Sequence, residues 1–105
     1  MKRNGILASG SWIVDQVKLV DVYPQRETLA NILSQDEGTG GSPYNVLITL
    51  AKMGAKIPMS AAGLVGKDEL GDYILADLKR HKIDTSQMRS TTKAPTSYTD
   101  VMTEV

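Results

Sequence analysis

The sequence predicts an α/β protein, in which helices pack on a sheet and an extra patch of strands lies beside it. Two segments, 42–53 and 68–82, carry helical apolar periodicity, and a short apolar run typical of a buried strand separates them. Period-two alternation occurs near both ends of the chain. The expected order is three strands, a helix, a strand, a helix and a strand, which indicates one small α/β domain.

The first 41 residues are predicted to form strands and one loop. Short apolar runs at 6–8 and 12–14 flank a Gly-Ser turn signal, and residues 17–22 alternate at period two. Pro24 ends this part, and 28–33 is a further short apolar run. The stretch SQDEGTGG that follows is polar and rich in glycine, so it is predicted to be a loop.

The first helix is predicted to begin with Ser42 as its N-cap. Pro43 suits the first helical position, because the N–H group that proline lacks would be unpaired there. Gly54 is expected to end the helix in the left-handed conformation. The helix has one apolar stripe, made by Val46, Leu47, Leu50 and Ala51.

The second half of the chain is predicted to contain a strand, a helix and a last strand. Residues 57–65 are short, apolar and bounded by glycine, which indicates a strand buried on both faces. The next helix begins with acidic Asp68 and Glu69 and ends with basic residues, among which His81 is expected to be a surface residue that complements the helix dipole. Period-two alternation at 99–105 predicts the last strand.

The composition argues against several classes of function. The 105 residues include 12 basic and 12 acidic side chains, so the net charge of zero offers no attraction to nucleic acid or to an anionic membrane. The chain has no cysteine and a single histidine, so neither disulfides nor a zinc site are expected. No apolar run is long enough for a signal peptide or a membrane span, and a cytoplasmic location is expected.

The glycine cluster before the first helix is the candidate binding site. Unpaired N–H groups of the first helical turn would point back toward residues 38–41, and Asn45 lies in the same turn. These groups could bind an anion or a hydroxyl-rich molecule, or the glycines could serve only a tight turn and a helix cap. The phosphate-loop pattern is absent because no lysine follows the glycines, and Pro43 stands where a dinucleotide-binding loop has its third glycine.

Four segments, in the right order, resemble the PfkB or ribokinase-like carbohydrate kinases. They are GSWIVD at 10–15, GGSPYN at 40–45, GLVGKDELGDYILADLKRHKIDTS at 63–86 and APTSYTDVMTEV at 94–105, so the resemblance covers nearly the whole chain. It implies a ribokinase-like, Rossmann-like parallel sheet that is incomplete in this chain. It also implies that residues 1–105 are the N-terminal part of the kinase domain, with a small β lid formed by strands near 15–40 and 97–105.

The resemblance also implies a function, the transfer of a phosphoryl group from ATP to a sugar hydroxyl. In such kinases the substrate is bound by an aspartate at the end of the first strand, by paired glycines and by an asparagine. The matching residues in this sequence are Asp15, Gly40, Gly41 and Asn45. A carboxylate accepts hydrogen bonds and an amide both donates and accepts, which suits a polyol.

The family's catalytic Gly-Ala-Gly-Asp motif does not occur in the chain, so catalytic residues are expected beyond Val105. ATP and Mg²⁺ are therefore expected to serve the complete enzyme, and this chain alone is expected to be inactive and to bind neither. The alternative is a non-catalytic α/β module that binds a sugar or a nucleoside. The resemblance further suggests a homodimer formed through the lid strands, and Trp12 is expected to pack in the core or lid.

Overall fold

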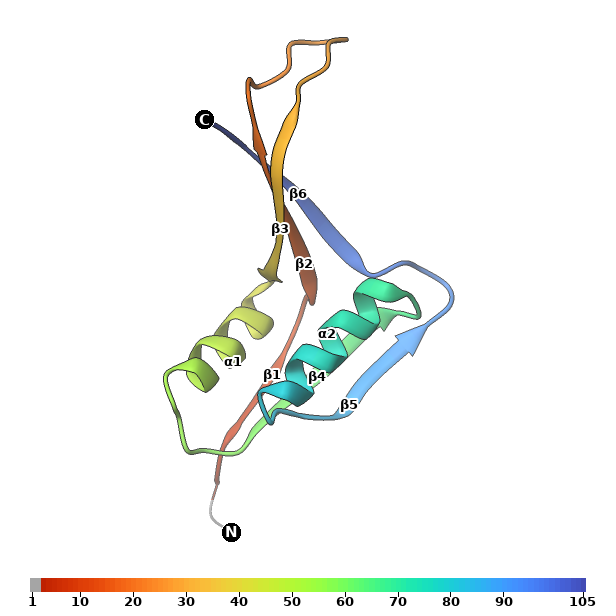
Figure 1. Ribbon diagram of the computed structural model, residues 1–105. Coiled ribbons are helices and arrows are strands. Elements are labelled where there is room, and N and C mark those ends of the chain that lie inside the picture. Colours follow the sequence, from red (N-terminus) through yellow and green to blue (C-terminus); the bar gives the residue numbers. More distant parts are fainter. Residues whose placement is uncertain (1–2) are drawn as a thin grey trace.

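The computed structural model describes residues 3–105, so the first two residues of the domain predicted at 1–105 lie outside the described range. The chain forms two parts (Figure 1). One is a three-stranded sheet with two helices packed on it, and the other is a three-stranded sheet that projects from the first part. The molecule is elongated as a result, with principal extents of 60 × 34 × 19 Å.

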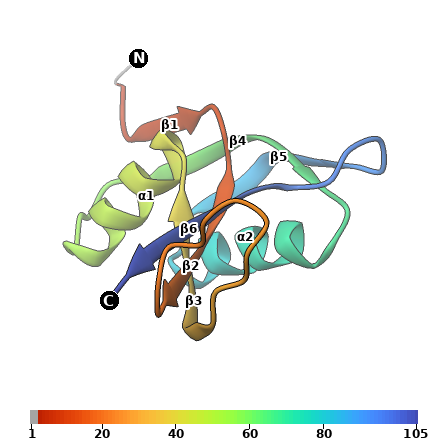
Figure 2. The same cartoon turned by 90° about the horizontal axis from the view of Figure 1, so that it is seen from above.

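The first sheet is entirely parallel. It consists of β1 (Ile6–Ser9), β4 (Met59–Gly66) and β5 (Asp84–Thr91), in the order β1-β4-β5. The helices α1 (Ser42–Lys52) and α2 (Glu69–Arg80) lie on the same face of this sheet (Figures 1 and 2). These are the two helices of residues 3–105, so the other face of the sheet carries no helix within that range.

The core fills the space between the helices and the parallel sheet. Trp12 is only 2% exposed and donates a hydrogen bond from Nε1 to the Ala62 carbonyl oxygen at 3.1 Å, which confirms that it is a packing residue. Its ring lies 5.7 Å from that of Tyr44. The buried apolar residues of the core are Trp12, Val14, Tyr44, Leu47, Ile48, Met59, Ala61, Val65, Ile74, Leu78, Ile83 and Met88.

The second sheet has the order β3-β2-β6. Its central strand β2 (Ile13–Val20) pairs antiparallel with β3 (Ile32–Gly40) and parallel with β6 (Ser97–Glu104). The alternation at the end of the sequence therefore predicted β6 correctly. Most side chains of β3 and all those of β6 are exposed, because no helix packs on this sheet.

Three predictions for the strands were wrong. The stretch SQDEGTGG, expected as a loop, forms most of β3, because its backbone pairs with β2 from Gly40, opposite Ile13, to Ile32, opposite Val20. Residues 28–31, expected as part of a strand, lie in the connection before β3. Strand β4 is buried on one face only, since Leu64 on the face without helices is 59% exposed.

The helices agree with the sequence more closely, with one correction at the start of α1. The N-cap is Gly41 and not Ser42, because the chain leaves β3 at Gly40 and must turn at the next residue. Pro43 lies at the start of the helix as predicted, and Gly54 has a φ of 78° after its last turn, which confirms the left-handed end. Strand β5 has a polar sequence without alternation and was not predicted.

A set of hydrogen bonds attaches the second sheet to the start of α2. Asp68, the N-cap of α2, accepts from the Gly71 N–H. It also accepts from the Thr96 N–H at 2.8 Å and from the Thr96 hydroxyl at 2.6 Å. The Gly66 N–H donates to the same hydroxyl at 2.8 Å. The bonds that Asp68 accepts, first that from the Thr96 side chain and then those from the Thr96 and Gly71 N–H groups, lower the pKa of Asp68.

We expect Thr96→Val to lower the free energy of unfolding by about 1–3 kcal/mol, because it leaves the buried Gly66 N–H without its acceptor. Urea unfolding followed by circular dichroism measures this loss. The control is Thr103→Val, which alters an exposed threonine of β6 and is expected to change stability by less than about 0.5 kcal/mol. Equal stabilities for the two variants would contradict the assigned role of Thr96.

Candidate functional site

The four site residues predicted from the sequence lie on β2, on the end of β3 and on the start of α1, and Figure 1 shows that β3 leads directly into α1. Asp15 is the third residue of β2, and Gly40 is the last residue of β3. Gly41 is the N-cap of α1, and Asn45 is the fourth residue of that helix. In the β2–β3 pair, Asp15 lies opposite Gly38, so its side chain is on the same face of the sheet as the position of Gly40.

Asp15 lies directly over Gly40. A Cβ atom placed on Gly40 would be 2.6 Å from Asp15 Oδ1 and 3.1 Å from the Ile13 Cβ atom. The carboxylate is partly buried and occupies the space that any larger residue at position 40 would need. The expected location of Asp15 at the end of the first strand was wrong, since β1 ends at Ser9 and the chain then crosses to the second sheet before Asp15.

The backbone conformation at position 41 requires glycine. Its φ is 89°, and a Cβ atom would lie 2.1 Å from the Ser11 carbonyl oxygen. The turn from β3 into α1 therefore fits against the crossing segment between β1 and β2 only when position 41 has no side chain. This supports the interpretation that Gly41 serves a tight turn before the helix. Gly40 differs, because its missing side chain makes room for the Asp15 carboxylate.

Asn45 is exposed at the first turn of α1, and its orientation is fixed by a neighbour that the sequence did not indicate. The Thr39 hydroxyl donates to Asn45 Oδ1 at 2.5 Å, and the Asn45 backbone N–H donates to the Gly41 carbonyl oxygen at 3.0 Å. No side chain caps the helix, and its first turn carries no acidic residue. The amide therefore lies at the start of a helix that no side chain caps.

Comparison with known proteins decides the family. The sequence profile of the pfkB family carbohydrate kinases matches residues 5–105. The chain belongs to the pfkB family. The resemblance and the ribokinase-like fold class inferred from the sequence are thus confirmed, including the incomplete parallel sheet.

Individual members of the pfkB family align with most of this chain. Mus musculus ketohexokinase is 30% identical over 88 residues, which are 84% of this chain and 29% of that protein. The ribokinase of Staphylococcus aureus (strain COL) is 36% identical over 94 residues, which are 89% of this chain and 30% of that protein. The chain therefore spans about a third of the length of these relatives.

The fold matches solved structures of the same family. A nucleoside kinase of Methanocaldococcus jannaschii, an archaeal member of the ribokinase family, superposes with a TM-score of 0.83. The match covers 99% of this chain and 34% of the nucleoside kinase at 21% sequence identity. The agreement extends over both sheets, so the projecting sheet is part of the fold that this pfkB family chain shares with the nucleoside kinase.

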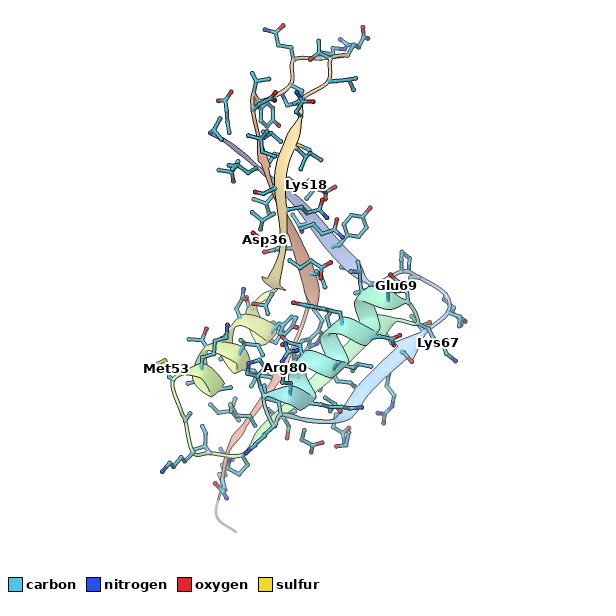
Figure 3. The ribbon with its side chains drawn as sticks, viewed as in Figure 1. Lys18, Asp36, Met53, Lys67, Glu69 and Arg80 are labelled. Atoms are coloured by element: carbon cyan, nitrogen blue, oxygen red, sulfur yellow. The ribbon has the colours of Figure 1, made fainter. Side chains whose placement is uncertain are left out.

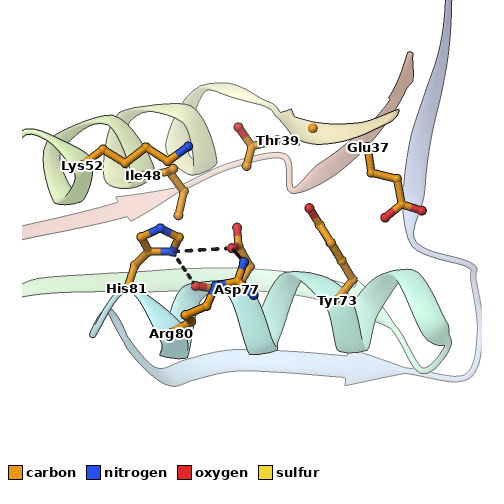
Figure 4. A pocket seen from close by; sticks show the side chains of 9 residues that line it. Glu37, Thr39, Ile48, Lys52, Tyr73, Asp77, Arg80 and His81 are labelled. Atoms are coloured by element: carbon orange, nitrogen blue, oxygen red, sulfur yellow. Dashed lines mark hydrogen bonds and ion pairs between the residues drawn. The ribbon is translucent and has the colours of Figure 1, made fainter. Parts of the chain in front are cut away.

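A polar cluster around the buried Asp77 was missed in the sequence. Figure 3 labels its Arg80, and Figure 4 shows its Asp77, Arg80 and His81 on α2. Tyr44 is fully buried and donates from its hydroxyl to Asp77 Oδ2 at 2.6 Å, and Arg80 pairs with the other oxygen of Asp77. His81 Nδ1 lies 2.8 Å from the Asp77 carbonyl oxygen. His81 does end α2 as predicted, but it is partly buried and not an open surface residue.

The cluster borders a cavity of about 470 Å³ between α1, α2 and the end of β3. A sequence signal for it exists, because Asp77 occupies an apolar position of α2 between Ile74 and Leu78. Burial, followed by the hydrogen bond to Asp77, raises the pKa of Tyr44 well above its usual range. The polar groups of the cluster satisfy one another, which is typical of a structural link between two helices.

Two classes of site are not found in the part of the chain that the structure describes. Among residues 3–105, no three histidine, cysteine, aspartate or glutamate side chains are grouped closely enough to hold a metal ion. Over the same residues, no helix has the length and apolar character needed to cross a membrane.

Proposed function

We propose that this chain is the substrate-binding, N-terminal part of an ATP-dependent sugar kinase, with Asp15, Gly40, Gly41 and Asn45 as its sugar site. The observation that carries the proposal is the position of the Asp15 carboxylate over Gly40, next to the uncapped start of α1. The membership of the pfkB family supports the class of reaction, and sugar kinases occur among the relatives.

The chemistry of these groups suits a polyol. The Asp15 carboxylate accepts hydrogen bonds from sugar hydroxyl groups, and hydrogen bonds to a charged acceptor contribute about 1.5–3 kcal/mol. The Asn45 amide offers a donor to a sugar oxygen. Gly40 and Gly41 expose backbone without side chains, so a ring can lie close to the chain at this point.

We propose that the second sheet acts as a lid. Asp15 belongs to this sheet, whereas Asn45 belongs to the helical part, so the two halves of the site are on different parts of the molecule. Movement of the sheet toward the helical part would bring the carboxylate to the sugar and exclude water from it. The lid then comprises the predicted strands near 15–40 and 97–105.

Phosphoryl transfer calls for groups that this chain does not supply. ATP with Mg²⁺ would provide the transferred phosphoryl group and the charge that stabilises it. Residues 3–105 contain no cluster of metal ligands, and the sequence contains no Gly-Ala-Gly-Asp motif. We therefore assign only sugar binding and orientation to these residues, and we expect the chain alone not to phosphorylate sugars. The need for ATP is consistent with a cytoplasmic location.

A homodimer through the lid is part of the same proposal. The second sheet has exposed apolar side chains on strands that no helix covers, and such side chains are often buried in an interface between subunits. The side chains concerned are Val17, Ile32, Leu33, Tyr98, Val101 and Met102.

Calorimetric titration of the intact protein with ribose, fructose and adenosine tests the sugar site. We expect Asp15→Asn and Asn45→Ala each to weaken binding by about ten- to a hundredfold, without a change in the circular dichroism spectrum. The matched control is Asp36→Asn, which removes an exposed carboxylate of the same sheet and is expected to leave binding unchanged. Unchanged affinity in Asp15→Asn, or loss of fold in both site variants, would contradict the proposal.

A further inference from the structure

We propose that Thr39 is a positioning residue that makes Asn45 a hydrogen-bond donor to the substrate. The inference rests on the proposed sugar site. It adds Thr39 to that site and assigns the Asn45 side chain as a donor and not an acceptor toward the substrate. It starts from the short hydrogen bond of 2.5 Å between the Thr39 hydroxyl and Asn45 Oδ1, which joins the end of β3 to the first turn of α1.

Thr39 is held more firmly than Asn45. It lies in the paired part of β3 opposite Val14, whose side chain is fully buried, and it is itself partly buried. Its branched side chain has few rotamers in a strand. Figure 4 shows Thr39 at the end of β3, beside α1 and at the border of the cavity between the helices. Its position is therefore set by the sheet, independently of any ligand.

Asn45 is exposed, so without a partner its amide would rotate in solvent. The bond from Thr39 occupies Oδ1 and turns Nδ2 to the other side of the amide. A ligand then meets an amide donor that is already ordered, which reduces the entropy lost on binding. The two polar side chains of the site become complementary, since Asp15 accepts from a ligand hydroxyl and Asn45 donates to a ligand oxygen.

The substrate must accordingly present both kinds of group. It needs a hydroxyl donor for Asp15 and an oxygen acceptor for Asn45, such as a ring oxygen or a second hydroxyl group. This requirement is met by sugars and by nucleoside riboses, whereas an ammonium group at the position facing Asn45 would be rejected because it cannot accept.

Three variants of the intact protein test this role with the tightest-binding of ribose, fructose and adenosine. We expect Thr39→Val, which keeps the shape and removes the hydroxyl, to raise Kd by about three- to tenfold, and Thr39→Ser to restore it. We expect Asn45→Asp to bind as weakly as Asn45→Ala, because a carboxylate has lost the donor. Retained affinity in Asn45→Asp would overturn the donor assignment.

A double-mutant cycle separates this inference from the proposed function. If Thr39 acts through Asn45, adding Thr39→Val to Asn45→Ala causes no further loss. Additive losses would overturn the positioning role while leaving the sugar site intact, whereas an unchanged Kd in Asn45→Ala would contradict the site itself. The side-chain amide signals of Asn45 in a ¹H–¹⁵N spectrum need no sugar, and they are expected to shift in Thr39→Val and to return in Thr39→Ser. Signals that do not move would overturn the hydrogen bond.

Discussion

Gly41→Ala is expected to destabilise the protein by about 3 kcal/mol or more. A positive φ of 89° is unfavourable for alanine by about 1–3 kcal/mol, and the new Cβ atom would lie 2.1 Å from the Ser11 carbonyl oxygen. Both atoms in this overlap are fixed to the backbone, so relief requires the turn into α1 or the crossing segment to move. Urea unfolding measures the loss.

The neighbouring glycines provide matched comparisons. Gly40→Ala places its methyl group 2.6 Å from Asp15 Oδ1, and the carboxylate is expected to move away, so sugar affinity falls by about tenfold or more with a smaller loss of stability. Gly38→Ala meets no atom within 4 Å and is expected to change neither quantity. The assignment would be wrong if Gly41→Ala were as stable as Gly38→Ala, or if the variants at 38 and 40 bound sugar equally well.

These glycines show where local sequence was informative and where it was not. The cluster itself was visible in the sequence, as was the helix that follows it. The separate roles of Gly40 and Gly41 were not visible, because they depend on contacts with Asp15 and Ser11, about 25 to 30 positions earlier. The stretch from Ser34 was mistaken for a loop for the same reason, since its strand is defined by pairing with β2 and not by its own polar residues.

The helices could be predicted because their limits depend on neighbours in the sequence. Pro43 and Gly54 act within one turn of the helix they border, and both lie where they were predicted. Asp68 was predicted as an acidic residue of the first turn of α2, and it is the N-cap of that helix. The polar edge strand β5 has no comparable local signal. The role of Asp15 in a sugar site came from the family resemblance.

Asp77 is the clearest example of a residue that required the fold. Its position on the apolar face of α2 is compatible with burial, but its partner Tyr44 is 33 positions away on another helix. Asp77 is 5% exposed and accepts from Tyr44 and Arg80.

We expect Tyr44→Phe to lower the free energy of unfolding by about 2 kcal/mol, because a buried carboxylate oxygen then lacks a donor.

The same pair predicts a loss of stability in alkaline solution. Because burial and then the bond to Asp77 raise the pKa of Tyr44 in the folded state, its contribution is complete below the unfolded value of about 10 and decreases as the pH rises above it. The pKa of Tyr73 is raised as well, mainly by burial, and adds to the slope. Urea unfolding between about pH 8 and 11 should therefore show a steep decline in the natural protein and a shallower one in Tyr44→Phe.

Tyr98→Phe, which alters an exposed tyrosine of β6, is the control and should keep the steep alkaline decline. An equally steep decline in Tyr44→Phe would show that the hydroxyl of Tyr44 is not held neutral by its surroundings.

The Tyr44–Asp77 bond also bears on the proposed sugar site, because Tyr44 precedes Asn45 in the first turn of α1. If the Tyr44–Asp77 bond fixes that turn on α2, Tyr44→Phe should weaken sugar binding modestly at neutral pH, where both proteins remain folded.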